Sequence, residues 1–132
     1  MEQIKEQLRS HDIQPSAQRM AVAKFVLNTN EHPTADRVWT TVNENFPMIS
    51  RATVYNTLHL FVEKGLLKEV HVTGGSVVYD AHTEPHHHFI DESTGAIHDV
   101  PWDAVDVCRI ENLKGFDVND YQVVMRGRKS RG

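Results

Sequence analysis

The sequence predicts an α+β protein with an N-terminal winged helix-turn-helix domain and a small C-terminal α/β domain. Three observations predict this class: helical spacing of apolar residues in the first half, two β-branched runs after it, and a change in charge balance between the halves. Residues 1–68 hold eight Lys or Arg and seven Asp or Glu, whereas residues 69–132 hold six and eleven. The acidic second half suits a cation-binding or dimerising module. We therefore assign residues 1–79 to the winged helix, 80–85 to a hinge and 86–132 to the second domain.

Four helices are expected in the first domain. They run from Glu2 to about His11, from Ser16 to about Asn28, from Thr34 to just before Pro47, and from Ser50 to Lys64. Ser16, Thr34 and Ser50 stand where an N-cap hydroxyl accepts a backbone N–H. Gly65 stands where the end of a helix favours glycine. In the fourth helix, apolar residues recur at i, i+4, i+7 and i+8 from Val54, so that face is expected to turn inward.

Two hairpins, a helix and a last strand are expected after the fourth helix. The runs LLKEVHV and SVVYD, separated by Thr73-Gly74-Gly75, predict the wing. The runs HHHFID and GAIHDV, on either side of Glu92-Ser93-Thr94-Gly95, predict a second hairpin. A helix near Asp103–Leu113 and a strand within GFDVNDYQVVMRG complete the second domain. Cys108 is expected to be a small core residue on that helix.

The outward face of the fourth helix is polar but almost uncharged, which is unusual for an ordinary solvated face. Its members are Arg51, Ala52, Tyr55, Asn56 and His59. In a helix-turn-helix this helix enters the major groove, where arginine reads guanine and asparagine reads adenine. The pattern predicts a DNA-reading helix. The alternative is a helix packed in an all-helical core, with Arg51 and Tyr55 as ordinary surface residues.

Three consecutive histidines open the second hairpin. His86 and His88 leave the same face of a strand, and His87 leaves the opposite face. The hairpin register places Asp99 across from His88. Two imidazoles and one carboxylate are the ligand set of non-haem iron, and they also suit manganese or zinc. Asp80 at the hinge offers a second carboxylate; the alternative is a polar histidine edge that binds metals only adventitiously.

The composition limits the classes of protein to consider. The single cysteine, Cys108, excludes an internal disulfide and fits a reducing cytoplasm. The polar start MEQIKEQLRSHD is not a secretory signal, and no apolar run approaches the ~18 residues of a membrane span. We therefore expect a cytoplasmic protein without a membrane segment. Two domains this small are expected to rely on a metal or a partner subunit.

Taken together, these residues resemble the ferric uptake regulator family, and within it the peroxide-stress regulators. The resemblance spans nearly the whole chain and is carried by the shared order and spacing of six segments. These are PSAQR at 15–19, HPTAD at 32–36, SRATVYNTLHLFVEKGLL at 50–67, VVYD at 77–80, HHHFID at 86–91 and GAIHDV at 95–100.

The resemblance implies a homodimeric transcriptional repressor of double-stranded operator DNA, with the C-terminal domain forming the dimer, and not an enzyme. It implies one regulatory site per subunit for Fe2+ or Mn2+, which Zn2+ can also occupy in vitro. The implied ligands are His32, Asp80, His86, His88 and Asp99. The expected DNA contacts are Arg19, Ser50, Arg51, Thr53, Tyr55 and Asn56. A metal that joins ligands of both domains would fix the distance between the dimer's two recognition helices.

Asp99 favours the peroxide branch, because iron-uptake members of the family usually have a glutamate at that place. In peroxide sensors, ferrous iron in this site reacts with hydrogen peroxide, and the resulting oxidant modifies a histidine ligand and releases DNA. The resemblance makes His32 and His86 the oxidation-sensitive residues and peroxide the only small-molecule reactant. A repressor of metal-uptake genes that senses iron or manganese is the alternative.

Two departures from the family pattern concern other metal sites. Many members bind a structural zinc through two Cys-x-x-Cys pairs, whereas here Asp91-Glu92-Ser93-Thr94 stands at the first pair and the chain ends before the second. We therefore expect no structural zinc. Asp120-Tyr121 stands where many relatives have two histidines, which removes the usual ligand of a second site.

Two rival functions stay open: in one the histidines hold a catalytic metal, and in the other they are inert. An iron-dependent oxygenase would hold its metal through His86, His88 and Asp99, but fewer than 60 residues follow the wing. Such enzymes need a barrel of many strands to enclose a substrate, and consumption of oxygen with a 2-oxo acid would identify one. A metal-independent winged-helix regulator would instead bind DNA equally with and without a chelator.

Overall fold

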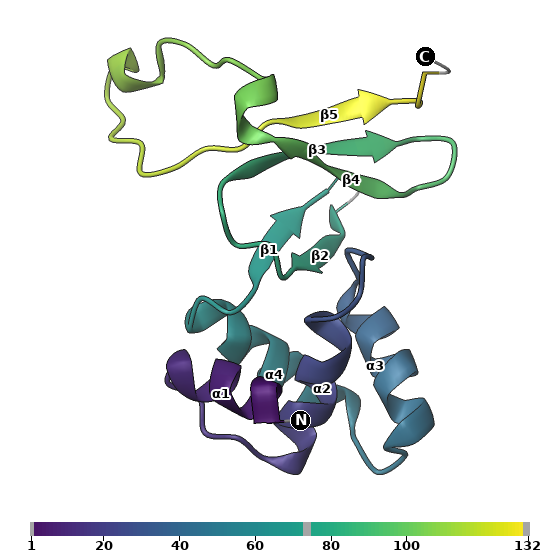
Figure 1. Cartoon of the computed structure of the whole chain (residues 1–132). Helices are drawn as coiled ribbons and strands as arrows, with labels where there is room; N and C mark the ends of the chain where they lie inside the picture. The colour runs from purple at the N-terminus through teal and green to yellow at the C-terminus, as the bar shows by residue number, and fades with distance from the viewer. Residues whose placement is uncertain (1, 73–74, 131–132) are drawn as a thin grey trace. The chain divides into compact units, whose positions relative to one another are not determined.

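The computed structural model describes residues 2–72 and 75–130. The chain forms two compact units, Met1–Thr83 and Glu84–Gly132, whose elements are labelled in Figure 1. None of the helices in the described part of the chain is long and apolar enough to cross a membrane.

The first unit is a helix-turn-helix followed by a two-stranded wing. Its elements are α1 (Glu2–Ser10), α2 (Ala17–Val26), α3 (Ala35–Asn45), α4 (Arg51–Glu63), β1 (Lys68–His71) and β2 (Val77–Asp80). The side chains of Ser16, Thr34 and Ser50 each accept the backbone N–H of the third residue after them. These hydroxyls satisfy a donor that the first helical turn leaves without a partner, so the three predicted N-caps are confirmed.

The wing is confirmed as an antiparallel pair. Lys68 of β1 pairs with Asp80 of β2, and the register continues to His71 and Val77 beside the turn. Thr73 and Gly74 of the predicted turn lie outside the described residues. Gly65, with φ +83, adopts the left-handed conformation that ends α4 and turns the chain toward β1.

An apolar core holds the helices of the first unit together. Its most deeply buried members are Leu8, Val22, Ala23, Val38, Val54, Leu58 and Phe61. Complete burial of one large aliphatic or aromatic side chain contributes about 1.5–3 kcal/mol. The inner face of α4 is therefore fixed by Val54, Leu58 and Phe61, and its opposite face is left to solvent.

The second unit is a three-stranded sheet with short irregular connections. Its elements are β3 (His86–Asp91), β4 (Ile97–Pro101), the 3-10 turns η2 (Trp102–Ala104) and η3 (Ile110–Asn112), and β5 (Val124–Gly127). The strand order is β4-β3-β5, with β4 antiparallel and β5 parallel to β3, and Figure 1 shows β3 in the middle. The second hairpin is confirmed, and the last strand is confirmed for its final four residues.

The helix predicted near Asp103–Leu113 is wrong. The segment makes two 3-10 turns, and Arg109 between them has φ 70, outside the helical region. A short helix needs an apolar stripe that packs against a neighbour, but Val107 is 36% and Leu113 is 51% exposed. Cys108 is also exposed, so the prediction that it is a core residue is wrong as well.

The interior of the second unit is polar. The residues buried in it are His86, His87, His88 and Asp91. Among the described residues of this unit, no apolar side chain is buried to the same degree. The fold of this unit therefore places imidazoles where the first unit places aliphatic side chains.

Candidate metal centre and nucleic-acid interface

Two histidines and one aspartate converge on the sheet of the second unit. His86 and His88 lie on the same face of β3, and His88 pairs with Asp99 of β4 in the register that the sequence predicts. The Nε2 atoms of His86 and His88 are 3.1 Å apart. Each of them lies 3.5 Å from Asp99 Oδ1. The three donor atoms form a nearly equilateral triangle.

The size of this triangle fits a first-row divalent cation. With metal–ligand bonds of about 2.1 Å, two ligands are ~3.0 Å apart at a right angle and ~3.4 Å apart at a tetrahedral angle. The separations of 3.1 and 3.5 Å match these values. Two imidazoles and one carboxylate on one side of a metal suit ferrous iron and manganese and leave positions for further ligands.

A backbone carbonyl orients the first of these ligands. His86 Nδ1 lies 2.6 Å from the carbonyl oxygen of Glu84. Because a carbonyl only accepts hydrogen bonds, the neutral ring carries its proton on Nδ1 and its lone pair on Nε2. This is the tautomer that presents Nε2 to a metal, and it is a common device for orienting histidine ligands.

His87 leaves the opposite face of β3 and joins an aromatic cluster. Its ring stacks on Trp102 at a centroid distance of 4.5 Å and an interplanar angle of 12°, and the Tyr121 ring lies 4.8 Å from Trp102. The backbone N–H of Val123 donates to His87 Nδ1 at 3.0 Å. Sequence reasoning assigned His87 no role. The alternation of side chains along a strand predicted that His87 points away from the metal ligands. Nothing in the sequence predicted that Trp102 and Tyr121, which come from the irregular segment, would cover it.

His32 and Asp80 form a second set of candidate ligands, within the first unit. His32 Nε2 lies 3.3 Å from Asp80 Oδ2. The carbonyl of Pro33 accepts the N–H of Tyr79 at 2.9 Å, which ties the segment before α3 to β2. The N–H of His82 donates to the other carboxylate oxygen, Oδ1, at 2.9 Å. The orientation of this carboxylate is thus set by the backbone.

The five ligands implied by the family resemblance are therefore distributed over both units. The second unit assembles three of them and the first unit assembles two. Each set is positioned by hydrogen bonds or strand pairing within its own unit. Ferrous iron and manganese commonly take more than three protein or water ligands, so neither set fills a coordination sphere.

The place of the family's first Cys-x-x-Cys pair is a hydrogen-bonded turn. Asp91 Oδ1 accepts the hydroxyl of Ser93 at 2.6 Å and its N–H at 2.9 Å. These two bonds, the hydroxyl first, lower the pKa of Asp91 below its ordinary value. A charged hydrogen-bonded turn thus closes this hairpin, and Cys108 is the single cysteine of the sequence.

The polar face of α4 is exposed, as predicted, with Arg51, Tyr55 and Asn56 in solvent. Ser50 Oγ accepts the N–H of Thr53 at 3.0 Å and donates to its hydroxyl at 2.9 Å. The two hydroxyls predicted to contact DNA therefore also hold the first turn of α4.

Asp36 of α3 contacts this face, although the sequence did not single it out as a site residue. Its Oδ1 accepts hydrogen bonds from Arg51 Nη1 at 2.9 Å and from the Tyr55 hydroxyl at 2.7 Å. The bond to Asp36 is the main reason that the pKa of Tyr55 is raised. The Arg51 guanidinium also lies 4.3 Å from the centre of the Trp39 ring. The packing of α3 against α4 creates these contacts, and a single sequence does not reveal that packing.

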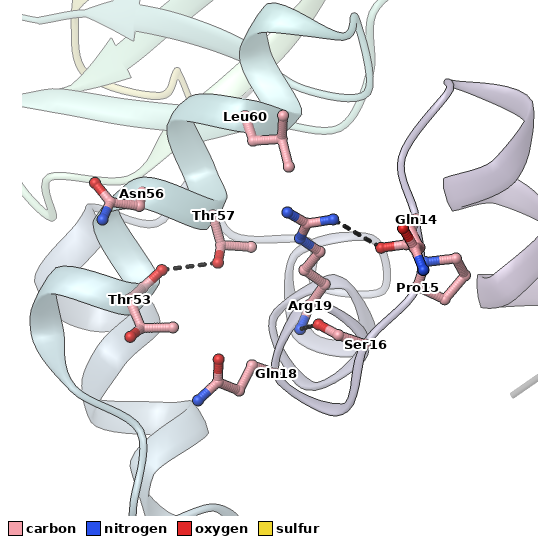
Figure 2. Close-up of a pocket in the computed structure, with 9 residues that line it drawn as sticks. All are labelled: Gln14, Pro15, Ser16, Gln18, Arg19, Thr53, Asn56, Thr57 and Leu60. Carbon is pink, nitrogen blue, oxygen red and sulfur yellow. Dashed lines mark hydrogen bonds between the residues drawn. The ribbon is translucent and has the colours of Figure 1, made fainter.

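Arg19 lies at a polar pocket of about 450 Å³ beside α4. The pocket is lined by Gln14, Pro15, Ser16, Gln18, Arg19, Thr53, Asn56, Thr57 and Leu60. Arg19 Nη1 donates to the carbonyl of Gln14 at 2.8 Å, and Figure 2 shows its side chain between α4 and the turn that precedes α2. Arg19, Thr53 and Asn56, all predicted DNA contacts, therefore line one polar surface of the first unit.

Comparisons with known proteins reach both units. The sequence model of the Ferric uptake regulator family matches residues 10–126. A peroxide-responsive repressor of Staphylococcus epidermidis is 31% identical over 122 residues, which cover 91% of this chain and 81% of that protein.

Solved structures are similar over almost the full chain. A ferric uptake regulator from Pseudomonas aeruginosa with manganese has a TM-score of 0.73 at 23% identity and covers 96% of this chain and 98% of its own. PerR from Streptococcus pyogenes, described as sensing peroxide, has a TM-score of 0.55 at 29% identity and covers 97% and 89%. The first structure shows only that the fold is shared, whereas the second is also similar in sequence.

Proposed function

The chain belongs to the Ferric uptake regulator family of metal-responsive regulators, and from that premise we propose that it is a transcriptional repressor whose affinity for operator DNA depends on one bound Fe2+ or Mn2+ ion. The observation that carries the proposal is the triangle of His86, His88 and Asp99, whose donor types and separations fit such a cation. This arrangement forms within one hairpin of the second unit.

In the proposed complex, His32 and Asp80 complete the coordination that the triad begins. One ion bound by ligands of both units would hold them at one angle. In a homodimer, this angle sets the distance between the two α4 helices, which must match half-sites one turn of DNA apart, about 34 Å. Metal affinity and operator affinity are then coupled, and each raises the other by the same factor.

The exposed face of α4 is the proposed interface with double-stranded DNA. Arg51, Tyr55 and Asn56 are assigned to the major groove, where their donors and acceptors distinguish bases. Arg19, Ser50 and Thr53 are assigned to phosphates, which position the helix without reading sequence.

Peroxide sensing is the more specific form of the proposal. It is supported by the likeness to peroxide-responsive repressors and by an aspartate rather than a glutamate at position 99. Bound ferrous iron would supply the one-electron chemistry through which hydrogen peroxide oxidises a ligand imidazole, with one oxygen atom of the peroxide added to the ring and the other released as water. His86 and His32 are the assigned targets, as the family resemblance implies, and loss of either ring as a ligand would weaken the joined site. A repressor that responds to iron or manganese itself is the second candidate.

Metal dependence is tested first. The Mn2+-loaded chain is used to enrich a duplex from a random pool, and binding of that duplex is measured with and without a chelator. We expect Asp99→Ala to lose metal-dependent binding. His98→Ala, on the same strand β4, is the matched control and should behave as the wild type. Operator binding by the Asp99→Ala variant that equals the wild type, with or without metal, would overturn the proposed switch.

Peroxide sensing is tested by mass spectrometry. The Fe2+-loaded chain is treated with dilute hydrogen peroxide, and tryptic peptides are compared with those of the Mn2+-loaded chain. We expect one added oxygen on His86 or His32 in the iron form alone, with a parallel loss of DNA binding. Unmodified ligand peptides and full DNA binding after treatment would reject peroxide sensing in favour of metal sensing.

A further inference from the structure

One carboxylate oxygen connects two of the side chains assigned to DNA reading. Asp36 Oδ1, on α3, accepts Arg51 Nη1 at 2.9 Å and the Tyr55 hydroxyl at 2.7 Å, both on α4. The ring of Trp39, also on α3, lies beneath the Arg51 guanidinium at 4.3 Å. Arg51 is thus held at its edge by a carboxylate and at its face by an aromatic ring.

These contacts are poorly placed to stabilise the fold. The side chains of Arg51 and Asp36 are 61% and 65% exposed, and ion pairs at such positions contribute little to stability because water screens them. The packing of α3 against α4 is already supplied by buried residues such as Val38 and Val54. The consequence of the contacts is therefore the orientation and the net charge of the exposed face.

The orientation leaves both side chains able to read bases. An arginine has five N–H donors in a rigid fork, so the bond to Asp36 leaves others whose direction is fixed by the stacking on Trp39. The Tyr55 hydroxyl donates its one hydrogen bond to Asp36, so toward any other group its oxygen acts as an acceptor. We propose that Asp36 is a specificity-determining residue of the DNA interface, which positions Arg51 and Tyr55 for base edges and opposes binding to phosphates alone. This inference rests on the proposed function of α4.

The opposition to phosphates follows from charge. Random DNA attracts a protein through phosphates, by an amount set by the number of cationic contacts. Asp36 offsets the charge of Arg51 and places a negative group near the DNA backbone. In an operator, base edges that accept hydrogen bonds from the oriented arginine compensate for this loss of attraction, whereas other sequences lack those acceptors. Asp36 therefore lowers non-specific affinity more than specific affinity.

The test compares two substitutions in the Mn2+-loaded full chain. Asp36→Asn keeps an acceptor oxygen and removes the charge, whereas Asp36→Ala removes both. Affinities are measured across a salt series for a random duplex pool and for the duplex that the wild type enriches from it. We expect Asp36→Asn to tighten pool binding about fivefold at ~0.15 M salt and to steepen the salt slope by about 0.9 per bound subunit. Asp36→Ala should also weaken binding of the enriched duplex about tenfold.

Glu31→Gln is the matched control. Glu31 forms an ion pair of similar exposure with Arg37, at 3.4 Å in the same unit, and its loss should leave the pool affinity and the salt slope unchanged. Asp36→Glu restores the charge and should return the slope to the wild-type value. Thermal unfolding of each variant separates these effects from misfolding.

Two outcomes overturn the inference in different ways. Pool affinity and salt slope in Asp36→Asn and Asp36→Ala that equal those of Glu31→Gln reject the role of Asp36 alone. Failure of the wild-type chain to enrich any duplex rejects the proposed function, and the role of Asp36 with it, before any variant is made.

Discussion

The two units of the chain differ in what they bury. The first encloses a continuous apolar cluster that includes Leu8, Leu58 and Phe61, whereas the residues buried in the second are His86, His87, His88 and Asp91. The second unit also leaves Leu113 and Phe116 exposed by 51% and 72%. A small domain without an apolar interior needs a metal or a partner subunit to be stable. The comparison indicates that the first unit is stabilised by its own apolar core, whereas the stability of the second depends on the metal or the partner subunit that it binds.

The largest expected effect is a loss of stability in the first unit alone. Phe61→Ala removes a fully buried ring and should lower the free energy of unfolding of this unit by about 3–5 kcal/mol. The chain has one tryptophan in each unit, Trp39 and Trp102, so fluorescence of single-tryptophan variants follows each unit separately during denaturation. Met48→Ala, at a position that is 89% exposed, is the control. Equal shifts of both tryptophan transitions would show that the units do not unfold independently.

The next effect acts on the second unit. Mn2+ at about 100 times its dissociation constant should raise the free energy of unfolding monitored at Trp102 by about 2.7 kcal/mol, because the ion binds the folded form. His88→Ala should abolish this increase, and His98→Ala should retain it. If the unfolding transition monitored at Trp102 does not respond to Mn2+ in the wild type, the stability of the second unit does not depend on this metal.

A smaller effect is expected on the proposed dimer. Phe116→Ser removes an exposed apolar ring from the second unit and should weaken self-association about tenfold, or ~1.4 kcal/mol. Sedimentation equilibrium measures this change. Met48→Ser makes a similar substitution on the first unit and should leave association unchanged. If Met48→Ser has the larger effect, the exposed apolar residues of the second unit are not its partner surface.

The smallest effect is a pH dependence of the second unit. The folded form holds the pKa of Asp91 below that of an unfolded carboxyl, through hydrogen bonds from Ser93. The resulting stabilisation is present above the unfolded pKa, about 3.9, and is lost as the pH falls through the lower folded value. Asp91→Asn should flatten the acid limb of the Trp102 unfolding curve, measured with chelator so that metal release does not contribute. An unchanged acid limb would show that other groups control it.

The first unit was predictable because its signals are local. Each capping hydroxyl lies within three residues of the N–H that it accepts, and the apolar spacing of α4 gave its buried face. The irregular segment after β4 was not predictable in this way, since a helix was expected near Asp103–Leu113 but the apolar residues Val107 and Leu113 stay exposed in the structure. Propensity without packing does not maintain a short helix.

The residues of the candidate site also differ in whether the sequence alone could predict them. Strand alternation and hairpin register were enough to predict the triad of the second unit. The pairing of His32 with Asp80 joins residues far apart in the chain and came only from the family resemblance. Asp36 was missed for a similar reason, because its partners Arg51 and Tyr55 are 15 and 19 residues away and are reached through helix packing.

The position of β3 in the middle of its sheet has a consequence for how the proposed site would release and recapture its metal. His86 and His88 are carried by a strand that is paired on both sides, to β4 and to β5. In the proposed site, release of the ion would lower the stability of the unit but leave both ladders in place, and with them the strand that carries the two imidazoles. The ligands would then stay together for the next ion, and the rate of recapture would be set by arrival of the cation.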